Sequence, residues 1–123
     1  MRILLFFLPV SLVFGLLWIF DATHLLGAHP WWSRRVLIYG LIPGFLLAWA
    51  AYRTGLTHRI RIALPALLAL AAFGTASWGK AQFAASFAEN TLAGQVWFYG
   101  WIAACAFAAA ACAAIATPDA QVT

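Results

Sequence analysis

Three residues whose side chains could bind a metal ion, Asp21, His24 and His29, lie close together in the first connecting segment of the chain. If the preceding helix continues by one turn, Asp21 and His24 share a face, because residues i and i+3 are neighbours on a helix. Their carboxylate and imidazole groups are ligands for zinc or copper. A closed site needs a further ligand, and Asp21 has possible ion-pair partners in Arg34 and Arg35. The sequence therefore favours a structural ion pair over a metal site.

A second polar cluster, made by Arg53, His58, Arg59 and Arg61, lies within a segment of nine residues. These side chains could bind phosphate, either on an anionic lipid or on a substrate headgroup. The simpler interpretation, which we favour, is that they orient the protein by the excess of basic residues in cytoplasmic loops. Because His58 is expected on the opposite side of the membrane from the histidines of the first cluster, it cannot share a haem with them.

The rest of the sequence offers little for catalysis. It contains no Gly-rich phosphate loop, Ser-His-Asp set, pair of carboxylates or Cys-x-x-Cys motif. Cys105 and Cys112 would lie roughly 10 Å apart on a helix, which is too far for a disulfide. Every Asp, Glu, Lys, Arg and His lies at or beyond the end of an apolar segment, whereas a proton-coupled transporter would need one at mid-depth. We therefore predict no enzyme activity and no cofactor.

The composition points to a lipid environment. Of the 123 residues, 66% are hydrophobic and only 8% are charged, against roughly 25% charged in soluble domains. A soluble fold of this size could not bury so much apolar surface. The net charge of +4 comes from scattered basic residues, and it does not form the basic stripe expected of a nucleic-acid-binding protein.

Four apolar segments have about the ~20 residues needed to cross a bilayer, at 3–20, 36–52, 62–79 and 95–116. Helices are predicted for all four, because every backbone group must be satisfied inside the hydrocarbon. The first segment is too long for a signal peptide and ends in bulky residues, so we expect it to be retained. The sequence thus predicts an all-α integral membrane protein with a single four-helix transmembrane domain over residues 1–123.

The connections give further expectations. Ser33 is a candidate N-cap for the second helix, and residues 80–94 predict a short helix lying in the membrane interface. With four spans, the side that holds both termini and the cluster at 53–61 carries four basic residues, and the other side carries three. This bias predicts a multi-pass protein of a bacterial-type inner membrane, with both termini in the cytoplasm.

The phrase V-x-x-Y-G-x-I occurs twice, at 36–42 and 96–102, and a shift of sixty residues also pairs Trp18 with Trp78. Coincidence in a chain rich in Ala and Leu is one explanation. We favour an internal duplication of a two-helix hairpin. Because this unit has an even number of spans, its copies would form a parallel repeat rather than an inverted one.

Each copy of the phrase begins a strip of small residues spaced one helical turn apart. Such strips allow close packing of helix backbones in lipid, where the hydrophobic effect contributes little to helix association. Sequence alone leaves open whether the two strips meet each other or face another subunit. The strips are Gly40, Gly44 and Ala48 in the second helix and Gly100, Ala104 and Ala108 in the fourth, continuing to Cys112.

The last helix is rich in Ala over 103–116, so its side chains are small on all faces. A helix that faces lipid usually carries larger side chains, so we expect protein around it on more than one side. Four short helices do not easily supply that cover alone. The sequence therefore predicts a non-catalytic accessory, scaffold or assembly subunit that packs against other membrane subunits or against itself. The alternative is a homo-oligomeric channel or transporter for a small solute.

Overall fold

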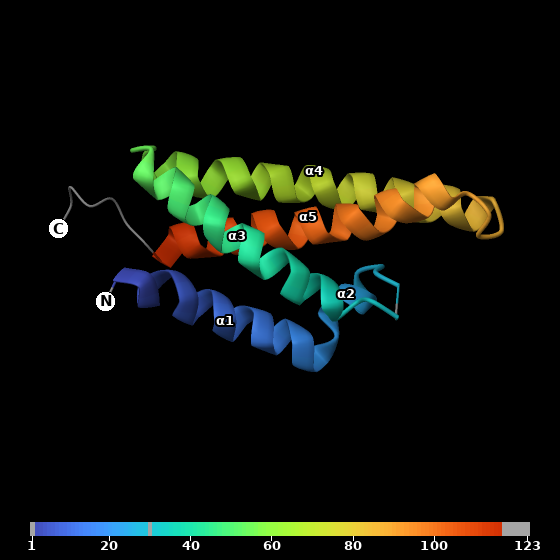
Figure 1. The fold of residues 1–123 in the computed structure, drawn as a ribbon, viewed down its shortest axis with the longest axis horizontal. Coiled ribbons are helices and arrows are strands. Elements are labelled where there is room, and N and C mark those ends of the chain that lie inside the picture. The colour runs from blue at the N-terminus through green and yellow to red at the C-terminus, as the bar shows by residue number, and fades with distance from the viewer. Residues whose placement is uncertain (1, 30, 117–123) are drawn as a thin grey trace.

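The computed structural model describes residues 2–29 and 31–116, and the side chains from residue 8 onward within these ranges. The described chain is helical, with no strand (Figure 1). The helices are α1 (Arg2–Phe20), the short α2 (Ala22–Leu25), α3 (Arg35–Arg53), α4 (His58–Ala85) and α5 (Thr91–Ala116).

Three of these helices, α3, α4 and α5, are long and apolar enough to cross a membrane. In α1 the described apolar stretch, Leu8–Phe20, is shorter. An all-helical chain with three such helices fits a membrane-embedded protein, as the composition predicts.

The hairpin of α4 and α5 is longer than predicted. Residues 80–94 do not form a separate interfacial helix, so that prediction was wrong: α4 continues to Ala85, and α5 begins at Thr91. The chain reverses between them through Phe87 and Ala88, whose φ angles are 54° and 65°. With 28 and 26 residues, the two helices are about 42 and 39 Å long at ~1.5 Å per residue. They therefore extend beyond a hydrocarbon layer of ~30 Å.

The four long helices alternate in direction, and α5 lies between the others (Figure 1). It packs most extensively against α4, then against α3, and least against α1. Half of its most apolar stretch is buried inside the protein. The small side chains of α5 explain this central position, because they let three neighbours approach its backbone closely.

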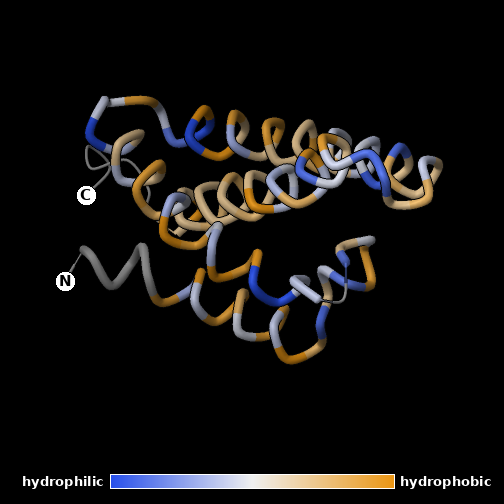
Figure 2. The backbone as a smooth tube through the Cα atoms, turned by 45° about the vertical axis from the view of Figure 1, so that its right-hand side comes forward, coloured by the Kyte–Doolittle hydropathy of each residue, from blue (hydrophilic) through white to orange (hydrophobic). Residues whose placement is uncertain are grey.

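The alternating helices give the bundle two different ends. The basic end contains the first turn of α1, the connection 54–57 and the last turn of α5, whereas the aromatic end contains α2 and the connection 86–90 (Figure 1). Figure 2 shows hydrophilic stretches near these connections and mostly apolar helices between them. The polar candidates for function therefore lie at the two ends of the bundle.

Candidate functional site

The small-residue strip of α3 lies against α5. Gly40, Gly44 and Ala48 are all buried. A Cβ atom added to Gly40 would lie 2.6 Å from the Cβ of Cys105, and one added to Gly44 would lie 2.6 Å from the carbonyl oxygen of Ala106. Real Cβ atoms do not come so close, so the two backbones approach at a distance that only glycine allows.

The strip of α5 meets other partners. A Cβ atom added to Gly100 would lie 2.9 Å from the Cβ of Ala76 on α4. Further along the same face, Ala104, Ala108 and Cys112 line an open groove. The two strips therefore do not meet each other: the α3 strip packs on a different face of α5, and Ala108 and Cys112 of the α5 strip are only partly covered.

The groove is a large open cavity on one face of the bundle. It has a volume of about 620 Å³, and its floor is the small-residue face of α5. Phe14 and Leu17 of α1 form one wall, and Leu70 and Phe73 of α4 form the other. Because α1 and α4 do not form a packed pair with each other, this face of the bundle stays open. Its lining is apolar almost throughout.

The predicted phosphate cluster divides at the basic end. Arg53 and Arg59 are exposed, and the guanidinium of Arg53 lies 5.7 Å from the ring centre of Trp49. Arg61 is only 3% exposed, and its guanidinium lies 5.0 Å from the ring centre of Tyr52. His58 Nε2 lies 2.8 Å from the carbonyl oxygen of Ala114 and donates to it. Arg61 and His58 thus have partners inside the bundle, whereas Arg53 and Arg59 are exposed, and binding of phosphate or an anionic lipid by these residues stays a prediction.

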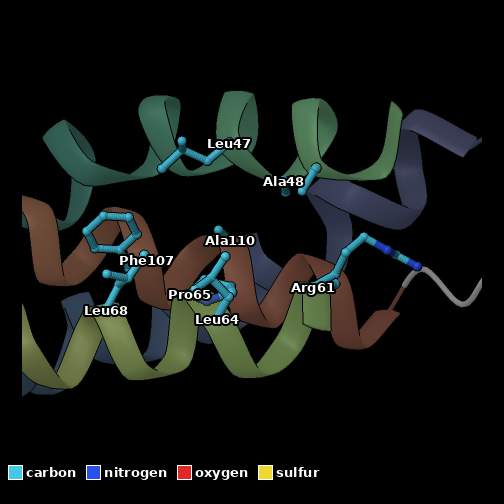
Figure 3. A pocket seen from close by; sticks show the side chains of 10 residues that line it. Leu47, Ala48, Arg61, Leu64, Pro65, Leu68, Phe107 and Ala110 are labelled. Carbon is cyan, nitrogen blue, oxygen red and sulfur yellow. The ribbon is translucent and has the colours of Figure 1, made fainter. Parts of the chain in front are cut away.

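Arg61 lines a small pocket of about 110 Å³ where α3, α4 and α5 meet (Figure 3). Both α3 and α5 end near this pocket, with their C-terminal carbonyl groups and the partial negative charge of their helix dipoles. The hydrogen bond that His58 donates to the carbonyl oxygen of Ala114 and the buried positive charge of Arg61 compensate that partial negative charge. At the sequence level Arg61 looked equivalent to Arg59, because nothing local shows that the end of α5 lies beside it.

The predicted ion pair of Asp21 with Arg34 or Arg35 is not formed. Its carboxylate accepts a hydrogen bond of 2.7 Å from Ser33 Oγ, and Arg34 Nε donates instead to the carbonyl oxygen of Trp18 at 2.8 Å. Ser33 is also not the N-cap of α3, because Arg34 occupies that position and no side chain caps the helix. The Ser33 side chain donates its hydrogen bond to Asp21 in the first connection and does not cap the first turn of α3.

A buried hydrogen-bond network fixes the first connection at the aromatic end. The hydroxyl of Thr23, 4% exposed, donates to the carbonyl oxygen of Ser33. Nδ1 of His24 lies 3.1 Å from the carbonyl oxygen of Ala28. Two of the candidate metal ligands, Asp21 and His24, are therefore engaged in hydrogen bonds within the connection. Among the described residues, no three His, Cys, Asp or Glu side chains gather closely enough to hold a metal ion.

Comparison of the chain with protein-family models, curated proteins and solved structures finds no match. The groove offers a surface that another apolar molecule or helix could contact. The arrangement provides apolar contact surfaces and hydrogen-bonded polar groups. The Ser33 hydroxyl that donates to Asp21 is buried within the first connection and does not line the groove.

Proposed function

We propose that the chain is a non-catalytic accessory, scaffold or assembly subunit of a membrane complex, and that its open groove receives a transmembrane helix of another subunit. The observation that carries this proposal is the half-buried part of the α5 strip, Ala108 and Cys112, which lies at the floor of the groove beside the buried Ala104. Inside the molecule, small-residue faces are used for helix contact: Gly40 and Gly44 seat α3 on α5. A further face of this kind fits a further helix.

The shape of the groove favours a helix over a single lipid chain. Its floor runs from Trp101 to Cys112, which is about 16 Å, or three turns, at ~1.5 Å per residue. Small floor residues make a close backbone approach possible, which stabilises helix pairs through dispersion and Cα–H···O contacts. A flexible acyl chain gains nothing comparable from this regular spacing. The large side chains of both walls would pack against the flanks of the incoming helix.

The membrane arrangement belongs to the same proposal. We take α1 as a fourth span, because its 19 residues correspond to about 28 Å. The start of α1 and the end of α5 lie at the basic end with the arginine cluster (Figure 1), which supports two cytoplasmic termini in a bacterial-type inner membrane. The shared V-x-x-Y-G-x-I phrase supports a duplicated hairpin as the origin of the chain.

The test is native mass spectrometry of tagged protein extracted gently from its own host membrane. We expect foreign subunits in stoichiometric amount with the wild type. Ala108→Leu puts a larger side chain on the floor of the groove and should remove them. The matched control is Ala50→Leu, at an exposed position of α3 that does not line the groove, and it should retain them.

Two results would contradict the proposal. A closed homo-oligomer without foreign subunits would favour the channel or transporter, and solute flux through liposomes would then be measured. Foreign subunits that remain bound to Ala108→Leu as firmly as to the wild type would show that the groove is not the docking surface.

A further inference from the structure

Another cavity, of about 370 Å³, lies at the aromatic end and is separate from the groove. Its walls include Trp32, Phe83, Trp97 and Phe98, and His29 lies among them. The volume falls within the ~300–1,000 Å³ typical of small-molecule sites, which are mostly apolar with a few polar groups that orient the ligand. This combination of aromatic walls and one imidazole identifies the cavity as a candidate ligand site, which we call the aromatic pocket.

The walls of the aromatic pocket are held in place by contacts within the protein. Trp32 lies edge-on to both Trp97 and Phe98, with ring centres 5.1 Å apart in each pair. Trp97 Nε1 donates to the carbonyl oxygen of Gly27 at 3.1 Å. The ring of Phe83 packs so closely on α5 that a Cβ atom at position 94 would lie 2.9 Å from it. The rings are therefore positioned before any ligand binds.

Two hydrogen-bond donors accompany these rings. The backbone N–H of Trp31 donates to His29 Nδ1 at 3.1 Å. Because Nδ1 is the acceptor, a neutral His29 carries its proton on Nε2. That N–H group and the indole N–H of Trp32 have no hydrogen-bond partner among the residues the structure describes. Donors beside aromatic rings complement a planar ligand that carries acceptor oxygens.

The depth of the aromatic pocket narrows the ligand class further. Phe83 lies near the end of α4 and Phe98 lies about two turns inside α5, in the part of the hairpin that approaches and passes the hydrocarbon boundary. Trp and Tyr rings are enriched at this level of a membrane. A ligand that reaches the pocket from the bilayer would place its polar head here and leave an apolar tail among the lipids.

We propose that the aromatic pocket binds the headgroup of a membrane quinone, a planar ring with carbonyl oxygens on an apolar tail. The ring would pack against Trp32 and Phe98. One carbonyl oxygen of the quinone would accept hydrogen bonds from two groups, the Nε2–H of His29 and the indole N–H of Trp32. Binding requires no redox step. The inference goes beyond the accessory role and does not depend on the groove, which lies on another part of the bundle.

The experiment uses the full-length protein in lipid nanodiscs, a photoreactive azido derivative of a decyl-tailed benzoquinone as probe, and decyl-ubiquinone as competitor. After irradiation, mass spectrometry locates the label. We expect saturable labelling of peptides that contain residues 29–32 and 94–99, suppressed by the competitor. Wild-type mapping needs no variant, so the proposal can be tested even if a substitution prevents folding.

Variants then test the two donors. His29→Phe and Trp32→Phe each keep an aromatic ring and remove one hydrogen-bond donor. Each should raise the concentration of decyl-ubiquinone that halves the labelling by roughly two- to tenfold, as expected for the loss of one hydrogen bond. Trp78→Phe removes an exposed indole that does not line the aromatic pocket, and it should leave competition unchanged. All variants are compared as monodisperse protein on gel filtration.

Three results would overturn the proposal. The first is labelling that rises linearly with probe and spreads over lipid-facing residues, as expected for simple partitioning into the bilayer. The second is competition by added phosphatidylglycerol but not by decyl-ubiquinone, which would assign the aromatic pocket to a phospholipid headgroup. The third is unchanged competition in both donor variants.

Discussion

The two copies of V-x-x-Y-G-x-I contain the same tyrosine and glycine but pack differently. Gly40 faces α5, where an added Cβ atom would lie 2.6 Å from the Cβ of Cys105 and 2.8 Å from the backbone nitrogen of Ala106. Gly100 faces α4, where the nearest atoms belong to Ala76, at 2.9 to 3.1 Å. The first copy seats its helix on a helix of the other hairpin, and the second seats its helix on its own hairpin partner.

The difference shows which properties a local sequence determines. In both copies the phrase gives a helix with a small-residue face, but the position in the bundle decides what that face meets. Under the sixty-residue shift, Ala76 corresponds to Leu16. Leu16 is 57% exposed and does not lie against Gly40. A duplicated sequence, if that is the origin of the phrase, has therefore not kept a duplicated packing.

The largest expected effect is at the first copy. Gly40→Ala adds one methyl group against backbone atoms of α5 that cannot rotate away, so α3 must move outward. We expect a loss of about 2 to 3 kcal/mol in the free energy of unfolding, near the upper end for overpacking. The measurement is reversible unfolding in mixed micelles with increasing SDS, followed by circular dichroism. Gly44→Ala should behave similarly.

Gly74→Ala is the control for this experiment. Gly74 lies within α4, and an added Cβ atom would meet nothing within 4 Å. The substitution should be neutral or should stabilise the helix by up to about 1 kcal/mol, since Ala is the better helix former. If Gly40→Ala were as stable as Gly74→Ala, the close contact between α3 and α5 would not exist.

A smaller effect is expected at the second copy. Gly100→Ala brings two methyl groups together, and the loss should be about 1 to 2 kcal/mol. Here the opposing group can be removed: Ala76→Gly in the same chain should restore part of that stability, although glycine within a helix costs about 1 kcal/mol. The four proteins of this double-mutant cycle are unfolded under identical conditions. Strictly additive effects would contradict direct contact between the two positions.

Much of the fold could be predicted from composition and segment length. The all-helical fold, the three long apolar helices and the central place of α5 follow from apolar runs and from the small side chains of 103–116. The extension of α4 to Ala85 was missed, because Lys80 and Gln82 read as a polar boundary. A helix that leaves the bilayer can continue when its partner helix does the same.

The candidate sites were less predictable, because each depends on segments far apart in sequence. Arg61 is buried where the end of α5 lies beside the start of α4. Trp97 joins His29 and Trp32 across almost seventy residues. In the sequence these tryptophans are indistinguishable from ordinary membrane-interface residues. Only the tertiary arrangement separates an enclosed ring from one that faces lipid.

The smallest expected effect concerns the tyrosines of the two phrases. Tyr39 is 50% exposed and Tyr99 is 61% exposed, and neither hydroxyl has a hydrogen-bond partner among the residues the structure describes. Tyr39→Phe and Tyr99→Phe should each change the free energy of unfolding by less than about 0.5 kcal/mol, as for other exposed positions. Both are measured by the same SDS titration, side by side.

Equal and negligible effects would show that the two copies of the phrase differ only at their glycine faces. A loss above about 1 kcal/mol, the value of a hydrogen bond, at Tyr99 alone would show that its hydroxyl has a partner in the membrane that Tyr39 lacks. Tyr99 also lies at the aromatic pocket. Repeating the titration with decyl-ubiquinone would then show whether that partner is the ligand. If the Tyr99 hydroxyl binds the ligand, adding it should increase the difference in the free energy of unfolding between the wild type and Tyr99→Phe.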